Sequence, residues 1–464
     1  MADFASAIYS SADKVWNVEN DRGQYSEEQI KLAKEYLGIA NMPLTESERA
    51  DTKARIYYMR SLVRESKFEE AEAVYIELSN LTNLEPCDTE LPMLFRLLEV
   101  HFLLFTDKLD AAEEKLHYFG PRVGSMIPRH KYYLYCNKGT LHIMRGRYLD
   151  GLEWCKEALE VSKRNNDFLP DNSEKPRLLG NIGMCYSNLH FPHKAIIYLL
   201  KARALYPEKG ADRLGLALDL TLAYNYLLIN ALYEAKDTLD NCRMQANALK
   251  DTHYIGLTML HFGVLHMKTR NWEMALTCLD QSIKCYEKGS AFHFAATHRK
   301  ILCLIHARTF KEARKLITRA QVLYNTHEVY SKYIESTVHY LAISMRKTFS
   351  NPEAVNYIMN VTIPHYKKMC DFFEAISYYE LLEENFRKTG NPTKALRMIG
   401  AIQELHQRCL LGDERSNLFS IPVNATPANP LPPNPRKSPS PIAHICSCPI
   451  EEDYPEYPCL ELRL

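Results

Sequence analysis

Two asparagines, Asn137 and Asn181, have side chains well suited to holding an extended peptide. A side-chain amide offers both a donor and an acceptor, so it pairs with the N–H and C=O of a peptide backbone whatever the peptide's sequence. Both asparagines stand fourteen residues before a recurring alanine or glycine mark of the sequence. Because they share this position, we predict that they clamp a peptide backbone together.

Other polar and aromatic residues occupy the same position along the chain. We call this set the groove row, and it consists of Tyr57, Asn137, Asn181, Thr221, His261, Arg299 and Tyr340. Asn, Tyr, His and Arg suit partner recognition better than the Lys and Glu of an ordinary solvated face. Arg177, one helical turn before Asn181, or Arg299 would take a terminal carboxylate with a forked contact. Tyr57 and Tyr224 would form apolar walls. The alternative is that these side chains only face solvent.

Catalytic patterns are missing from the sequence. It contains no phosphate-binding loop, dinucleotide fingerprint, H-E-x-x-H or G-x-S-x-G motif. His261 and His266 are five residues apart, a poor fit to one helix face. We therefore predict no catalytic residue, cofactor or metal. Cys446, Cys448 and Cys459 could bind a metal together with His444, but free thiols in an unstructured tail are favoured, because zinc sites normally show two close pairs.

Composition limits the partners of the chain. Its 464 residues carry 57 basic and 57 acidic side chains, so the net charge gives no argument for nucleic acid or an anionic membrane as the main partner. No apolar run approaches the roughly 18 to 20 residues that span a bilayer, and the first residues lack the pattern of a secretory signal. The 13 cysteines mostly stand singly, like small core residues. These features predict a cytoplasmic protein with free thiols.

The elements that position the groove row belong to a repeat of about 40 residues. Its mark is an alanine that follows an apolar residue and two variable ones, as in KFEEA and TFKEA. The marks are Ala71, Ala112, Gly151, Ala195, Ala235, Ala275, Ala313, Ala354 and Ala395. Twelve residues earlier several units have a second small residue, such as Gly183 or Gly263. Small residues at both marks predict two helices that cross closely.

Stacked helix pairs bury apolar faces that a single pair would leave exposed, so the repeat predicts an all-α, right-handed solenoid of about nine pairs. The period also suits HEAT and armadillo arrays. The paired small residues, and the aromatic residues Phe68, Trp272 and Phe310 opening second helices, favour tetratricopeptide packing. The predicted domains are a helical lead-in at 1–44, the solenoid at 45–412 and a proline-rich disordered tail at 413–464.

Two capping boxes mark helix starts near the N-terminus. Ser26 with Gln29 precedes one helix, and Thr45 with Glu48 precedes the helix that leads into the first repeat.

The repeats resemble a known group of proteins. The units of about 40 residues, the phrase LLGNIGMCYSNLHFPHKAIIYLLKA and the lead-in from YSEEQ to EAVY are similar to the Rap/NprR/PlcR group. The resemblance covers about residues 25–410. It implies a cytoplasmic receptor for a short secreted peptide, with concave-face asparagines that clamp the peptide backbone, a role that transfers to Asn137 and Asn181.

The resemblance also implies features that this sequence lacks. Regulators of the group carry an N-terminal helix-turn-helix domain, and no such pattern is visible here, so direct DNA binding is not predicted. Rap members dephosphorylate a response regulator through a catalytic glutamine. Gln29 lies in the right general place, but its surroundings do not match. The leading hypothesis is a non-enzymatic, peptide-responsive regulator of a protein partner. The alternatives are a passive scaffold and a Rap-like phosphatase.

Overall fold

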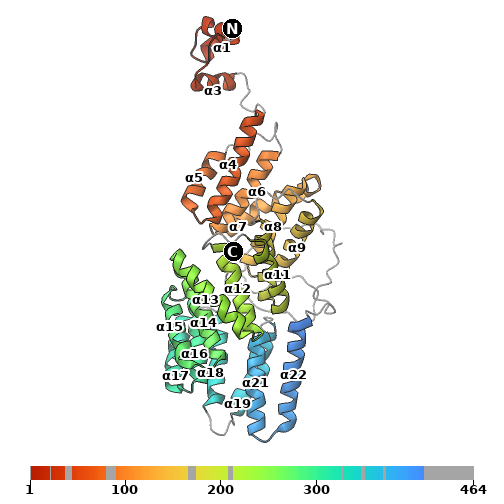
Figure 1. Cartoon of the computed structure of the whole chain (residues 1–464), viewed down its shortest axis with the longest axis vertical. Coiled ribbons are helices and arrows are strands. Elements are labelled where there is room, and N and C mark those ends of the chain that lie inside the picture. The colour runs from red at the N-terminus through yellow and green to blue at the C-terminus, as the bar shows by residue number, and fades with distance from the viewer. Residues whose placement is uncertain are drawn as a thin grey trace, which may run out of the picture. The chain divides into compact units, whose positions relative to one another are not determined.

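The computed structural model describes the following residues: 2–20, 22–36, 44–79, 90–165, 174–206, 213–325, 328–345, 351–368 and 372–411. Throughout these ranges the regular structure is helical, which confirms the predicted all-α class (Figure 1). None of the described helices combines the length and apolar character needed to cross a bilayer. The proline-rich tail and its cysteines lie outside the described residues. The chain divides into two compact units, Met1–Asn137 and Lys138–Leu464.

The first unit begins with a small cluster of three helices and continues with repeat helices. Its helices are α1 Ala2–Ala7, α2 Ala12–Glu19, α3 Glu27–Tyr36, α4 Glu46–Arg64, α5 Phe68–Leu78, α6 Glu90–Phe105, α7 Leu109–His117, the 3-10 turn Gly120–Ser125 and most of α8 Pro128–Met144. Both predicted capping boxes are confirmed. Ser26 and Gln29 exchange backbone-to-side-chain hydrogen bonds before α3, and Thr45 and Glu48 do so before α4.

The second unit continues the helix pairs. Its helices are α9 Tyr148–Arg164, α10 Glu174–Asn188, α11 Pro192–Leu205, α12 Arg213–Leu228, α13 Leu232–Leu249, α14 Thr252–Lys268, α15 Trp272–Lys284, α16 Ala291–His306, α17 Phe310–Leu323, α18 Glu328–Ser344, α19 Pro352–Tyr357, the π-helical turn Ile358–Thr362, α20 Ile363–Lys368, α21 Phe372–Lys388 and α22 Pro392–Leu411.

Each alanine mark lies in the first turn of the second helix of a pair, where it is buried. Ala195, Ala235 and Ala275 are wholly inaccessible to solvent. The aromatic residues Phe68 and Trp272 open their second helices as predicted. From α4 to α22 the described residues form nine such pairs. The tetratricopeptide-like repeat inferred from the marks is therefore present in the structure.

The earlier small residues mark close helix crossings, as predicted. A Cβ atom added to Gly183 would lie 2.7 Å from Leu199 Cγ, and one added to Gly263 would lie 2.6 Å from Leu279 Cγ. Real Cβ atoms do not approach other atoms so closely, so only glycine fits between the two helices at these points. The partner in each case lies four residues after the alanine mark, one turn along the second helix.

In eight of the nine pairs the structure describes the turn between the two helices, and this turn has a backbone feature that the sequence did not predict. The residue five places before the mark has a positive φ, and in six units it is not glycine. These six residues are Ser66, Asp107, His190, Asn230, Arg270 and Arg308. Gly146 and Gly390 occupy the place in two other units. A positive φ costs energy for residues with a side chain.

Polar groups link the first helices of successive pairs. In the second unit, the Asn225 amide on α12 donates to Ser187 Oγ on α10 at 2.9 Å and to its own helix at the Thr221 carbonyl. The His298 ring on α16 lies 3.0 Å from Thr337 Oγ1 on α18. Because these groups are buried, the bonds fix how consecutive pairs are set against each other.

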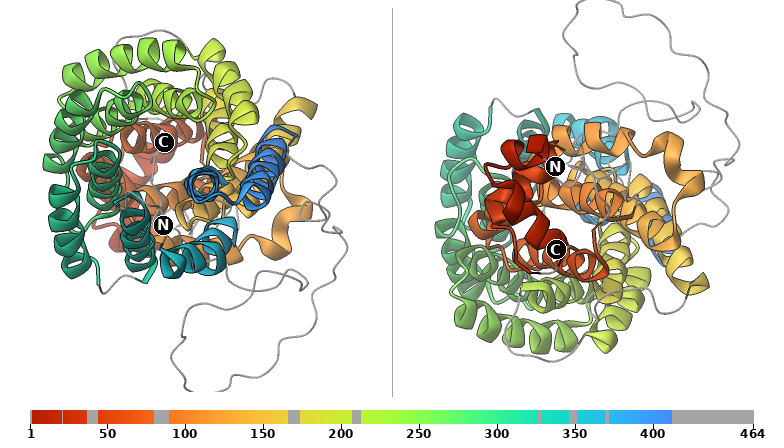
Figure 2. Two further views of the ribbon diagram at one scale, coloured as in Figure 1. Left: turned by 90° about the horizontal axis from the view of Figure 1, so that it is seen from below. Right: turned by 90° about the horizontal axis from the view of Figure 1, so that it is seen from above.

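The last helix pair of the second unit returns to an earlier one. Figure 2 shows the pairs from α10 to α18 following one another around a curve, with α22 back beside α11. Phe373, at the start of α21, lies with its ring 5.9 Å from the ring of His190 in the turn before α11. Helix α21 therefore faces the first helices of earlier repeats.

Candidate functional site

A hollow in the second unit lies between α21 and the first helices of the preceding pairs. We call it the groove cavity. Its larger lobe has a volume of about 610 Å³ and is lined from α14, α16, α18 and α21. Its smaller lobe of about 220 Å³ is lined from α12, α14, α16, α21 and α22. Both lobes share the residues Val264, Lys268, Arg299, Glu374, Ser377 and Glu380. The volume suits a small ligand.

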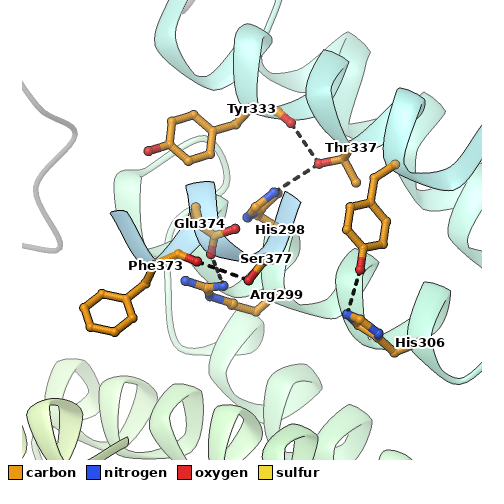
Figure 3. A network of polar contacts seen from close by, with 9 residues as sticks. His298, Arg299, His306, Tyr333, Thr337, Phe373, Glu374 and Ser377 are labelled. Carbon is orange, nitrogen blue, oxygen red and sulfur yellow. Dashed lines mark hydrogen bonds and ion pairs between the residues drawn. The ribbon is translucent and has the colours of Figure 1, made fainter. Parts of the chain in front are cut away.

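The centre of the groove cavity is an ion pair that bridges it. The Arg299 guanidinium on α16 donates to the Glu374 carboxylate on α21, 75 residues away in sequence. Figure 3 shows these two side chains meeting, with Ser377 and Phe373 of α21 beside them. The Glu374 side chain is only 8% exposed, whereas that of Arg299 is 32% exposed. Arg299 is therefore the partner that a molecule entering the cavity can reach.

The charges around Glu374 keep it ionised. Burial by itself would raise the pKa of this carboxyl, but the positive charge of Arg299 and the nearby His298 act against it, and the pKa of Glu374 is lowered. The carboxylate is thus held as an anion in a nearly closed environment, paired with the guanidinium opposite.

The smaller lobe contains a buried histidine that lacks a partner on one side. His261 is 4% exposed, and within the described residues its Nε2 has no hydrogen-bond partner. Its ring lies against Tyr224, with 5.5 Å between the ring centroids. Burial, followed by the positive charge of Arg299, lowers the pKa of His261 to about 4. At neutral pH the ring is uncharged. It can accept a hydrogen bond from a ligand or donate one to a ligand, depending on its tautomer.

Three residues at the rim come from the turns with positive φ, and the sequence analysis missed them. Asn230 lines the smaller lobe and accepts a hydrogen bond from Lys268 Nζ at 2.7 Å. Arg270 and Arg308 line the larger lobe. The signal that could have found them is the fifth residue before each mark, where glycine fits best and these units have a polar side chain instead.

Three of the predicted site residues meet at the groove cavity. Tyr224 and His261 line the smaller lobe, and Arg299 lines both. Tyr340 of the groove row lines the larger lobe. Thr221, by contrast, is fully buried and donates to the carbonyl of Ala217 in its own helix. The groove row therefore runs partly along the cavity and partly between helices.

Asn137 differs from the open groove amide that the sequence predicted. It is 3% exposed, and its amide nitrogen donates to the Leu97 carbonyl on α6 at 2.7 Å. The physical reason is its position between the first helices of consecutive pairs, where the buried side-chain amide needs a hydrogen-bond partner of its own. Asn137 thus has a structural role within the first unit.

Asn181 on α10 is a better candidate for the predicted role. It is 8% exposed, and among the described residues no hydrogen bond engages its amide. Arg177 is half-buried one turn earlier on the same helix. Tyr57 is half-buried on α4 of the first unit. The role of these residues in peptide binding stays a prediction.

Comparison with known proteins finds one curated relative and several solved structures that are similar to this chain. No family model matches the chain. It is 21% identical over 386 residues to the transcriptional activator NprA of Geobacillus stearothermophilus, which covers 80% of this chain and 91% of that protein.

Solved structures show the same fold. A Rap protein complexed with Competence and Sporulation Factor superposes with a TM-score of 0.64 at 14% identity, covering 78% of this chain and 99% of that one. The apo form of the quorum sensor NprR from B. thuringiensis gives 0.58 at 17% identity, and NprR with its cognate peptide NprX gives 0.58 at 18%. Each covers 77% of this chain and 99% of its own. The chain therefore has the tetratricopeptide-like fold of the solved NprR and Rap proteins.

Proposed function

We propose that this protein is a cytoplasmic, peptide-responsive regulator of the quorum-sensing type. It binds a short extended peptide in the groove cavity and thereby changes its interaction with a protein partner, without catalysing a reaction. The observation that carries the proposal is the groove cavity itself, which combines a ligand-sized volume with convergent polar groups from several repeats. The peptide and factor complexes named for NprR and Rap structures of the same fold support it.

The cavity also suggests how binding is transmitted. Its walls come from α12, α14, α16, α18 and α21, so one ligand touches several helix pairs. In a repeat array each pair contacts mainly its neighbours, and small changes in angle add up along the array. A ligand that favours one setting shifts the population towards it. The surface offered to a partner would change accordingly.

Affinity selection with a pool of random synthetic hexapeptides tests the proposal. The protein is mixed with the pool, separated by size exclusion, and the retained peptides are identified by mass spectrometry. A retained peptide should raise the free energy of unfolding by about 2.7 kcal/mol at a hundred times its Kd. Val264→Trp fills both lobes and should abolish retention, whereas Val322→Trp, at a residue 72% exposed on α17, should not. Equal retention by both variants, or none by the wild type, would contradict the proposal.

The two asparagines should respond differently to alanine substitution. Asn181 lies on α10, outside the lining of both lobes, so it would contact a peptide that extends from the smaller lobe along α10. Asn181→Ala should then lower the affinity for such a peptide by about 5- to 150-fold, because the peptide backbone loses its amide partner, with little effect on stability. Asn137→Ala should lower the free energy of unfolding by about 1 kcal/mol, because the buried hydrogen bond that joins α8 to the Leu97 carbonyl on α6 is lost. Isothermal titration and urea unfolding measure the two quantities. If Asn181→Ala unfolded the protein and left peptide affinity intact, Asn181 would be a structural amide as well.

A further inference from the structure

Opposite charges occupy the two walls of the groove cavity. Lys268 and Arg299 project from α14 and α16, and Arg270 and Arg308 stand in the adjoining turns. Helix α21 contributes Glu374, Glu380 and Glu384 to the lining. The wall formed by earlier repeats is therefore basic, and the wall formed by α21 is acidic.

The negative charges of the three glutamates all affect the side chain of Tyr340 at the cavity wall. Burial raises the pKa of the Tyr340 hydroxyl, and the negative charges of Glu374, Glu380 and Glu384 raise it further. All three carboxylates are therefore close enough to influence the same side chain at the cavity wall. Two of the glutamates also affect Lys268. Burial and the charge of Arg299 lower the pKa of Lys268, and the negative charges of Glu380 and Glu374 partly offset this lowering.

The N-terminal half of helix α21 meets earlier repeats through one ion pair and through aromatic contacts. Glu374 accepts from Arg299, and the ring of Phe373 lies near His190. Most contacts of α21 with other helices are to its own hairpin partner α22, followed by α20 and α18. The ion pair is therefore the tie between this half of α21 and α16 that a carboxylate ligand could break.

We propose that Glu374 is an internal competitor of the ligand, and that a carboxylate of the bound peptide replaces it on Arg299. The inference rests on the proposed function, because it concerns the same cavity. The exchange keeps the guanidinium paired with a carboxylate, so Arg299 is never left alone in the cavity. Glu374 then turns towards solvent and α21 shifts from the basic wall. A peptide that lacks a carboxylate cannot drive this exchange.

Three hexapeptide pools separate the sources of the carboxylate. The first has free C-termini and no Asp or Glu, the second has amidated C-termini with Asp and Glu included, and the third is amidated with neither acid. Each pool is mixed with wild type, with Glu374→Gln, and with Glu383→Gln. The last is a matched control on the same helix, because Glu383 lies outside the lining and pairs with Arg387.

We expect Glu374→Gln to bind carboxylate-bearing peptides about tenfold more tightly than wild type, the factor that corresponds to one net hydrogen bond. Peptides of the third pool should bind both proteins weakly and equally. Preference for the first pool would identify the C-terminus as the source of the carboxylate, and preference for the second an acidic side chain. Equal binding of all three pools by wild type would overturn the exchange while leaving peptide binding intact. If neither wild type nor the two variants retained peptides from any pool, both the proposed peptide binding and the proposed carboxylate exchange would be wrong.

Hydrogen exchange of the ligand-free protein gives a second readout. Amides in the first half of α21 should exchange faster in Glu374→Gln than in wild type and Glu383→Gln, since the tie to Arg299 is gone. Unchanged exchange would overturn the competitor role. If Glu374→Gln failed to fold, Glu374→Asp would replace it in both experiments. Aspartate keeps the negative charge, but its shorter side chain weakens the ion pair with Arg299. Smaller increases in hydrogen exchange and in peptide affinity are then expected.

Discussion

Replacement of Gly263 by leucine is expected to lower the free energy of unfolding by about 3 kcal/mol, at the upper end of the cost of overpacking. The Cβ atom alone would lie 2.6 Å from Leu279 Cγ and 2.7 Å from Leu279 Cδ2. Leu279 is fully buried, so it has nowhere to move, and α14 and α15 must separate. Urea unfolding followed by circular dichroism measures the change.

Gly400 provides the matched control for this substitution. It lies within α22, and a Cβ atom added there meets nothing within 4 Å. Gly400→Leu should leave stability unchanged or raise it by up to about 1 kcal/mol, because leucine is the better helix former. Ala275→Leu, at the mark facing the same crossing, should cost about 1 to 3 kcal/mol. Equal stabilities for the Gly263 and Gly400 variants would refute the close crossing.

Acidification should destabilise the second unit strongly. Burial lowers the pKa of His261 and of His298 from 6.5 to about 4 in the folded protein. Between these values the unfolded chain binds protons that the folded one does not, so stability is complete above pH 6.5 and is lost as the pH falls towards 4. The loss is on the order of 3 kcal/mol for each histidine. The pKa of the Glu374 carboxyl is also lowered in the folded protein, so its contribution to the free energy of unfolding is likewise lost as the pH falls below the ordinary carboxyl range.

Urea midpoints measured between pH 7.5 and 4.5 test this expectation. His261→Gln should flatten the profile, because the group that must remain neutral is gone. His193→Gln, on the exposed side of α11, should leave the slope as it was. A midpoint that stayed constant across this range would mean that the buried rings take up protons without cost.

The marks in the sequence predicted the fold because they record packing. Ala195 and Gly183 are small since two helix backbones meet there, and this constraint is local to one repeat. The capping boxes at Ser26 and Thr45 were predictable for the same reason, because each is complete within four residues. Helix type, order and pairing therefore follow from neighbouring residues alone.

The site was only partly predictable, because it depends on contacts between distant repeats. The groove row placed His261 and Arg299 at the cavity, but it could not distinguish an amide facing the ligand from one such as Asn137 that bonds the next helix. The return of α21 was beyond periodic reasoning, since Glu374 meets Arg299 across 75 residues. The polar turn residues were missed because the sequence shows their type but not their backbone angle.

Those turns also bear on how far the protein can be stabilised. Glycine at Ser66 would remove the cost of a positive φ, on the order of 1 kcal/mol. The same change at Asn230, Arg270 or Arg308 would relieve the same strain but strip side chains from the rim of the groove cavity. Substitution of Ser66 by glycine should therefore raise the free energy of unfolding in the first unit without affecting the ligand. In the second unit the same substitution at these turns should raise the free energy of unfolding but lower the affinity for the ligand. An engineered heat-resistant variant should therefore leave the turns at the cavity unchanged.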